Sequence, residues 1–370
     1  MQEGSKPKGN LFIATCIIYM VILVAFVGLR ILGGLGMYDR MPSWAAEITF
    51  SLLSQVLLMT IVPIVGILIY RKKFLRKEPK SFAEFTINPN ESSGTKEILS
   101  SWWFKKPSAQ ILGWSLVLGI FCFLFNIFVS SFFNGILASF GHRGASGGGG
   151  DIDGTYATIG AFIVAMVLIA VLPGICEEIT HRGLLMRGFA SRVGILRAIM
   201  LSSVLFGLMH LNVVQAFYAM ILGYLMALAV MATRNIWPAI IIHFMNNGFA
   251  VYFTFASARG WFMGDFFTHL GNFFGNSVFL VYIGSFVGLY LLIIAVIHKL
   301  ARDKFIKDNA KFEEPRRLHR SRGMSAIKYY ITADENKNRE PLSGIEKTLI
   351  YGIVFLGTVV TAMTLVWGFL

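Results

Sequence analysis

Long segments with few charged side chains recur along almost the whole chain, and they decide what it can fold into. A bilayer core of about 30 Å requires about 20 apolar residues per crossing helix. About nine segments meet this length: Leu11 to Leu35, Trp44 to Tyr70, Ile111 to Phe140, Tyr156 to about Met186, two spans within Arg197 to Arg234, Asn235 to Ala258, Leu270 to Ile297 and Thr348 to Leu370. We therefore predict an all-α, polytopic bundle of eight to nine transmembrane helices with a site inside the bundle.

The fifth and sixth spans follow from a length argument. No Lys, Arg, Asp or Glu occurs between Arg197 and Arg234, a stretch of 36 residues. At 1.5 Å per residue, a single helix of that length would measure about 54 Å, which exceeds a membrane crossing. We therefore expect two helices joined by a hairpin at Leu211-Asn212.

Composition excludes several other classes of protein. Hydrophobic residues make up 55% of the chain, too many for an ordinary soluble domain. The excess of 33 Lys and Arg over 20 Asp and Glu indicates basic cytoplasmic loops of a membrane protein and not nucleic-acid binding. All three cysteines fall in apolar runs, so neither a disulfide framework nor a cysteine metal site is expected.

The distribution of basic residues predicts the orientation and three regions. The loop Arg71 to Lys77 is rich in Lys and Arg, which favours the cytoplasmic side and places the amino terminus inside and the carboxyl terminus outside. Residues 1–155 form an N-terminal three-span region with this basic loop. Residues 156–258 form a core that carries polar residues at membrane depth, and 259–370 contain the C-terminal spans with another basic cytoplasmic loop.

Two carboxylates and an arginine interrupt the fourth span. A charged side chain at bilayer depth costs at least about 2.5–3.5 kcal/mol, so such residues indicate a functional site. Glu178 and Arg182 are four residues apart and can pair on one helical face, while Glu177 points about 100° away and shares its face with His181. One carboxylate can thus be held while its neighbour stays free to react.

Two later spans carry polar pairs with the same spacing. Phe206 precedes His210 by four residues, and His243 precedes Asn247 by four. Each pair therefore lies on one helical face, and counting along the helices places the histidines at a depth similar to that of Glu177. Asn246 is an alternative to Asn247, because residues three and four positions after His243 both lie near it.

These residues, in this order and on successive spans, resemble a known family. The patterns Glu177-Glu178-x-x-x-Arg182, Phe206-x-x-x-His210 and His243-x-x-x-Asn247 are similar to those of the CPBP intramembrane proteases. This family includes the type II CAAX prenyl endopeptidases and bacteriocin-processing or self-immunity proteins of bacteria. The resemblance covers about a quarter of the chain, from Tyr156 to Val251, and makes 156–258 a protease-like core.

The resemblance implies hydrolysis of a peptide bond within the membrane. Glu177 would activate a water molecule with help from His210, while His243 and Asn247 would stabilise the oxyanion; Glu178 and Arg182 complete the candidate catalytic set. A metal stays an open alternative, because Glu177, His210 and His243 offer carboxylate and imidazole ligands suited to a divalent ion such as zinc, without the His-Glu-x-x-His pattern.

The expected partners are the lipid bilayer and a peptide or protein substrate at the membrane, either prenylated or a leader peptide. Nucleic acid is not expected, and a bacterial plasma membrane is the expected location.

Two other functions fit the same residues. One is a proton-coupled secondary transporter, in which the buried ionisable groups relay protons. The other is a non-catalytic immunity or regulatory membrane protein that keeps the fold.

Overall fold

The chain is described here by a computed structural model that covers residues 10–70, 104–142, 158–266, 269, 279–308 and 341–369, and within these residues all regular structure is helical. In chain order the elements are α1 (Leu11–Gly34), α2 (Ser43–Ser51), η1 (Leu52–Ile61), α3 (Val62–Tyr70), α6 (Ala109–Ser139), α7 (Ile159–Ala165), η4 (Met166–Val171), α8 (Leu172–Glu178), η5 (Ile179–Leu185), α9 (Met186–Val193), α10 (Ile195–Leu208), α11 (Val213–Thr233), α12 (Trp237–Arg259), α14 (Phe279–Asp308) and α17 (Gly344–Phe369). The elements named η are π-helical segments inside longer helices.

Eight helices of the described residues are long and apolar enough to cross a membrane. This number lies at the lower end of the predicted range and confirms the polytopic helical bundle. The predicted fifth span is the exception, because α10 has only 14 residues. The expected hairpin is present: α10 ends at Leu208, α11 begins at Val213, and Leu211 between them has a positive φ of 50°.

Several helices begin at polar side chains that cap them. The side chain of Asn10 accepts from the backbone N–H of Phe12, and that of Asn212 accepts from Gln215 at the start of α11. At the start of α17, Ser343 and Glu346 each accept from the other's backbone N–H, which is a capping box. The first N–H groups of a helix have no partner inside it, so these caps fix where the spans begin.

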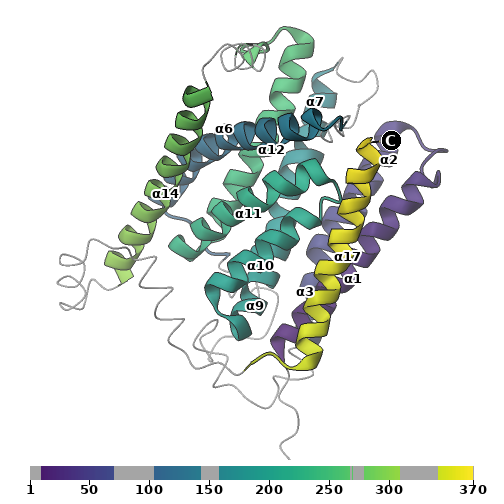
Figure 1. The fold of residues 1–370 in the computed structure, drawn as a ribbon, viewed down its shortest axis with the longest axis vertical. Coiled ribbons are helices and arrows are strands. Elements are labelled where there is room, and N and C mark those ends of the chain that lie inside the picture. Colours follow the sequence, from purple (N-terminus) through teal and green to yellow (C-terminus); the bar gives the residue numbers. More distant parts are fainter. Residues whose placement is uncertain are drawn as a thin grey trace, which may run out of the picture.

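The helices are arranged around a central group that carries the polar residues (Figure 1). Helices α1, α3 and α17 lie together along one side of the molecule, and α14 lies at the opposite edge next to α6. Between them, α9, α10, α11 and α12 pack against one another. Residues from the fourth, fifth, sixth and seventh predicted spans therefore meet in the middle of the bundle.

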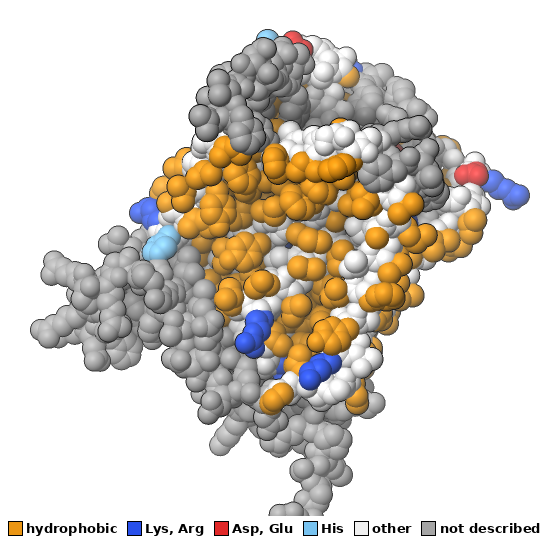
Figure 2. Space-filling view, viewed as in Figure 1, with side chains coloured by type: hydrophobic (Ala, Val, Ile, Leu, Met, Phe, Trp, Pro, Cys, Tyr) orange, Lys and Arg blue, Asp and Glu red, His pale blue; other side chains and the backbone are white. Residues whose placement is uncertain are grey.

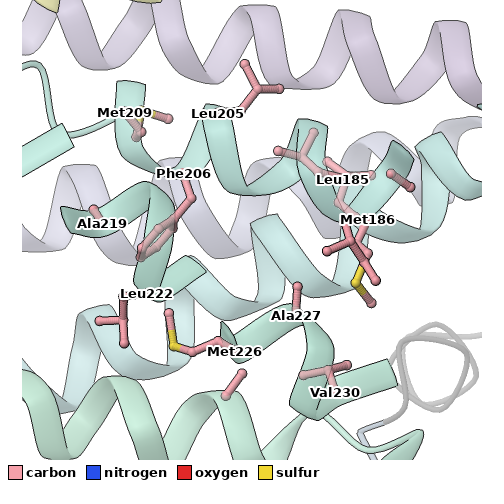
Figure 3. Close-up of a cluster of buried hydrophobic side chains, with 14 of the residues drawn as sticks. Leu185, Met186, Leu205, Phe206, Met209, Ala219, Leu222, Met226, Ala227 and Val230 are labelled. Atoms are coloured by element: carbon pink, nitrogen blue, oxygen red, sulfur yellow. The ribbon is translucent and has the colours of Figure 1, made fainter. Parts of the chain in front are cut away.

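Apolar side chains cover the outside and fill the inside of the bundle. Figure 2 shows a broad hydrophobic band across one face, with Lys and Arg side chains near its lower border. Inside, α10 and α11 contribute a closely packed cluster next to the polar centre (Figure 3), which includes Leu205, Phe206, Leu222 and Met226. The apolar exterior suits a bilayer, and the packed interior holds the central helices in fixed positions.

A network at one end of the bundle joins the first, fourth and last spans; we call it the Glu346 clamp. The buried carboxylate of Glu346 accepts from Nε and Nη2 of Arg192 at 2.7 and 3.0 Å, and from Nδ2 of Asn10 at 2.6 Å. It also accepts from the backbone N–H of Ser343 at 2.7 Å. The clamp places the described start of α1 and the start of α17 at the same end of the bundle, and it stabilises their packing through charge-assisted hydrogen bonds.

Some predictions concern segments outside the described residues. These are the basic loop Arg71 to Lys77, the external loop around residues 147–150 and most of the basic loop after the eighth span. Helix α14 runs to Asp308, beyond the predicted end of that span at Ile297. The sequence of this extension includes Lys and Arg residues, which are typical of a helix end outside the apolar core of a membrane.

Candidate functional site

The two adjacent glutamates lie on one continuous helical span, Ile159–Val193, but in different surroundings. The side chain of Glu178 is fully buried, whereas the side chain of Glu177 is 12% exposed. Neighbouring residues on a helix point about 100° apart, which explains the difference. Directly after Glu178 the helix widens into the π-helical segment η5, a distortion that is frequent at functional sites.

Glu178 is the centre of a buried network that joins three spans. Its Oε1 accepts from Nη1 of Arg182 at 2.8 Å, which is the predicted ion pair at i,i+4 spacing. The same oxygen is 2.9 Å from Nδ1 of His243 in α12, and that nitrogen donates because a carboxylate only accepts. Nη2 of Arg182 donates to the carbonyl of Gly223 in α11 at 2.9 Å. The charges are buried but paired, as buried charges must be.

Gly223 permits the close contact between α11 and this network. A Cβ at this position would lie 3.0 Å from Cδ1 of Phe206 and 3.3 Å from Nη2 of Arg182. Both separations are tighter than ordinary packing contacts. The absence of a side chain therefore allows the Gly223 carbonyl to accept from the buried guanidinium.

Phe206 is the packing centre of the ionisable groups. Its ring lies edge to face with the rings of His181, His210 and His243, at centroid distances of 5.0, 5.2 and 5.5 Å. The guanidinium carbon of Arg182 lies 4.5 Å from the centroid of the same ring. Edge-to-face contacts and cation–π contacts are both favourable, so one aromatic side chain holds four cationic or potentially cationic side chains in place.

The three histidines of the centre all use Nδ1 to hold the ring. Nδ1 of His181 is 2.8 Å from the carbonyl of Glu177, and Nδ1 of His210 is 2.8 Å from the carbonyl of Phe206. His243 uses Nδ1 toward Glu178. A hydrogen bond at one ring nitrogen fixes the orientation of the ring, and in each of these rings Nδ1 makes this bond, which leaves Nε2 for other contacts.

Glu177, the candidate base, contacts two groups with its two oxygens. Oε1 accepts from Nε2 of Gln55, in η1, at 2.9 Å. Oε2 lies 4.0 Å from Nε2 of His243. His210 packs against the same Phe206 ring as His243. The structure thus brings Glu177, Glu178, Arg182, His210 and His243 into one centre.

Asn247 lies in a chain of side-chain amides. Its Nδ2 donates to the carbonyl of Ile169 at 2.9 Å, and its Oδ1 accepts from Nδ2 of Asn246 at 3.0 Å. Oδ1 of Asn246 accepts in turn from Nδ2 of Asn126 in α6, at 2.9 Å. The two asparagines that compete for the predicted role are therefore bonded to each other, and Asn246 positions Asn247.

A zinc site requires at least three protein ligands around the ion. In the part of the chain that the structure describes, no three His, Cys, Asp or Glu side chains are placed to hold a metal ion. Glu177, His210 and His243 therefore do not form such a ligand set in this structure.

Three contributors to the centre were missed by the sequence reasoning: Gln55, Gly223 and Asn126. Gln55 and Asn126 are amide side chains inside otherwise apolar spans, and burying an amide is unfavourable without a hydrogen-bond partner. This is the signal that could have drawn attention to them. Gly223 gives no comparable signal, because its role depends on a neighbouring helix.

The fold and the centre define the class of this protein: it is an integral membrane protein with a buried carboxylate–histidine centre inside a helical bundle. Residues 159–249 match the family model described as type II CAAX prenyl endopeptidase Rce1-like. The matched segment is about a quarter of the chain and contains Glu177, Glu178, Arg182, His210, His243 and Asn247. This match confirms the resemblance to the CPBP family that the motifs indicated. No curated protein and no solved structure matches the chain.

Proposed function

We propose that this protein is an intramembrane endopeptidase that cleaves a peptide substrate at the membrane. The observation that carries the proposal is the approach of Oε2 of Glu177 to Nε2 of His243, 4.0 Å apart, within the segment that matches an endopeptidase family. This separation is too long for a direct hydrogen bond, but it suits a water molecule held by both atoms. A positioned water next to a carboxylate is the starting arrangement for hydrolysis.

Glu177 is the general base in this mechanism. Its carboxylate removes a proton from the water while the water oxygen attacks the peptide carbonyl carbon, so that a C–O bond forms and the carbonyl π electrons move to oxygen. When the tetrahedral intermediate collapses, the C–N bond breaks and Glu177 gives the proton to the leaving amine. The carboxylate is restored, and one water is consumed for each bond cleaved.

The remaining polar groups surround the reacting atoms. His210 packs against the same Phe206 ring as His243 and is assigned to holding the water. His243 and Asn247 are assigned to the oxyanion, where donors are most effective in a site that excludes bulk water. Because Nδ1 of His243 donates to Glu178, its Nε2 can donate to the oxyanion only in the imidazolium form of the ring. The amide nitrogen of Asn247 carries two N–H groups, so its bond to the Ile169 carbonyl leaves one for the substrate.

The function is tested with the purified protein in lipid vesicles. Three quenched fluorogenic probes are used: a peptide ending in a prenylated Cys-a-a-X sequence, the same peptide without the prenyl group, and an apolar peptide that spans the bilayer. We expect cleavage of at least one probe by the wild-type protein and none by Glu177→Gln. Repeating the assay after treatment with a chelator tests the metal alternative separately.

The same preparation separates the proposal from its rivals. A proton-coupled transporter would accumulate a solute in the vesicles without releasing peptide fragments. In cells, membrane peptides are compared by mass spectrometry with the wild-type protein, with Glu177→Gln and without the protein. If no fragment depends on Glu177, the endopeptidase proposal is wrong, and preference among the probes indicates whether the substrate is prenylated.

We also propose that the end of the bundle with the Glu346 clamp faces the cytoplasm. Four basic residues lie at or near the helix ends on this side of the bundle: Arg187, Arg192, Arg197 and Lys347. This agrees with the excess of basic residues that membrane proteins carry on the cytoplasmic side. Asp39, in the turn after α1, lies at the other end. Asn10, where the described residues begin, would then lie on the cytoplasmic side.

Cysteine labelling tests this orientation. The native cysteines Cys16, Cys122 and Cys176 are buried, so background labelling by an impermeant maleimide is low. Both Asp39 and Lys347 are exposed. We expect Asp39→Cys to react with reagent added outside intact cells and Lys347→Cys to react only after the membrane is opened. The reverse pattern would contradict the orientation.

A further inference from the structure

The second span, Ser43–Tyr70, lies outside the segment that matches the endopeptidase family, yet it forms two hydrogen bonds with the helix of the two glutamates. Nε2 of Gln55 donates to Oε1 of Glu177 at 2.9 Å. The carbonyl of Met59 accepts from the hydroxyl of Thr180 at 2.6 Å. Polar contacts therefore join the two spans beside the centre.

Gln55 is the contact that reaches the reactive carboxylate. Its side chain is partly buried in a segment that is otherwise almost entirely apolar, where an amide is unfavourable unless it is hydrogen-bonded. The two contact residues, at positions 55 and 59, lie about one turn apart in the π-helical segment η1, so they are on the same side of the helix. A distortion of this kind often accompanies a functional residue.

The other donors near Glu177 are already engaged. Arg182 donates to Glu178 and to the Gly223 carbonyl, and Nδ1 of His243 is directed to Glu178. Among the described residues, Gln55 is the side chain that lies within hydrogen-bond distance of the Glu177 carboxylate. The terminal torsion of a glutamate is soft, so a carboxylate without such a donor samples a wide range of orientations.

We propose that Gln55 is a positioning residue for Glu177. By holding Oε1, it fixes the plane of the carboxylate and directs Oε2 toward Nε2 of His243, where the attacking water is bound. This inference rests on the proposed endopeptidase function. It also assigns the second span a part in the reaction, although that span lies outside the family segment.

The variant Gln55→Met tests the proposal, because methionine has a similar length and no N–H donor. Misplacing a reacting group by about 1 Å lowers rates by up to about 100-fold. We expect kcat to fall about 10- to 100-fold for whichever of the three probes is cleaved, with KM within about twofold of wild type, because positioning acts on the chemical step. The yield of inserted protein and its thermal unfolding temperature should stay close to wild type.

The control is Thr180→Val, which removes the hydrogen bond to the Met59 carbonyl between the same two helices and leaves the bond between Gln55 and Glu177 in place. We expect kcat of this variant to stay within about twofold of wild type. A double-mutant cycle adds Gln55→Met to Glu177→Asp, whose shorter side chain cannot keep the Gln55 contact. We expect Gln55→Met to cause a much smaller loss in that background, because interacting groups are not additive.

Several results would overturn the inference. They are an unchanged kcat in Gln55→Met, a rise in KM alone, an equal loss in Thr180→Val, or the same fold-loss with and without Glu177→Asp. These outcomes differ from a failure of the endopeptidase proposal, in which Glu177→Gln itself would keep wild-type cleavage. Gln55 would then have no base to position, and the cleavage assay of Glu177→Gln shows this directly.

Discussion

Glu177→Gln is expected to lower the cleavage rate at least about 100-fold while the protein stays inserted and abundant. The substitution keeps the shape of the side chain and its contact with Gln55, but an amide cannot take the proton from water. General bases typically contribute about 10²–10⁴-fold to an enzymatic rate, which sets the expected size of the loss. The measurement is kcat/KM in vesicles for the probe that wild type cleaves.

The histidines provide a second part of this test. His210→Ala and His243→Ala should each abolish cleavage, and the triple variant should be hardly worse than any single one, because groups that act as a unit are not additive. Retention of more than about a tenth of wild-type activity by Glu177→Gln would remove Glu177 as the base. Simple addition of the three losses would show that the groups act independently.

Arg182→Ala should have the largest effect on stability. The side chain is 1% exposed and pairs with the fully buried Glu178, so its removal leaves a buried carboxylate without its cation. Breaking one side of a buried ion pair typically destabilises a protein by about 3–5 kcal/mol. We expect a large fall in the thermal unfolding temperature in detergent, together with loss of activity, because the Glu178 network also holds His243.

Two further variants define the role of the guanidinium. Arg182→Lys should be tolerated poorly, because a point charge cannot bond Glu178 and the Gly223 carbonyl at once in the same geometry. Arg30→Ala is the control: Arg30 is exposed and its guanidinium lies over the rings of Phe26 and Phe50, where each such contact is worth about 0.5–1 kcal/mol. Lost activity with unchanged stability in Arg182→Ala would instead place Arg182 in the chemistry.

Much of the fold could be predicted from the sequence because membrane length and apolarity restrict each segment separately. Helix α11, for example, begins just after the predicted hairpin, where Asn212 caps it. The Glu178–Arg182 pair was also predictable, because both residues lie on one helix and their spacing alone brings them together. In each case the deciding information is local.

The parts that escaped prediction depend on contacts between helices. Gln55 and Glu177 are 122 residues apart, and no periodicity links them. The Phe206 ring was recognised as a motif residue, but its contact with three histidines and Arg182 depends on how α8, η5, α10 and α12 pack. Likewise, the chain of Asn126, Asn246 and Asn247 requires α6 to lie beside α12. Spacing along one helix does not determine which face meets which neighbour.

The Glu346 clamp has a consequence for how the protein is made. Asn10 and Glu346 are 336 residues apart, so their hydrogen bond can form only after the residues between them have been synthesised. At elongation rates of about 5–20 residues per second, the start of α1 waits roughly 20–70 s before this partner arrives. The clamp therefore closes only after the helices that carry the polar centre have been synthesised, which makes its closure a late event in biogenesis.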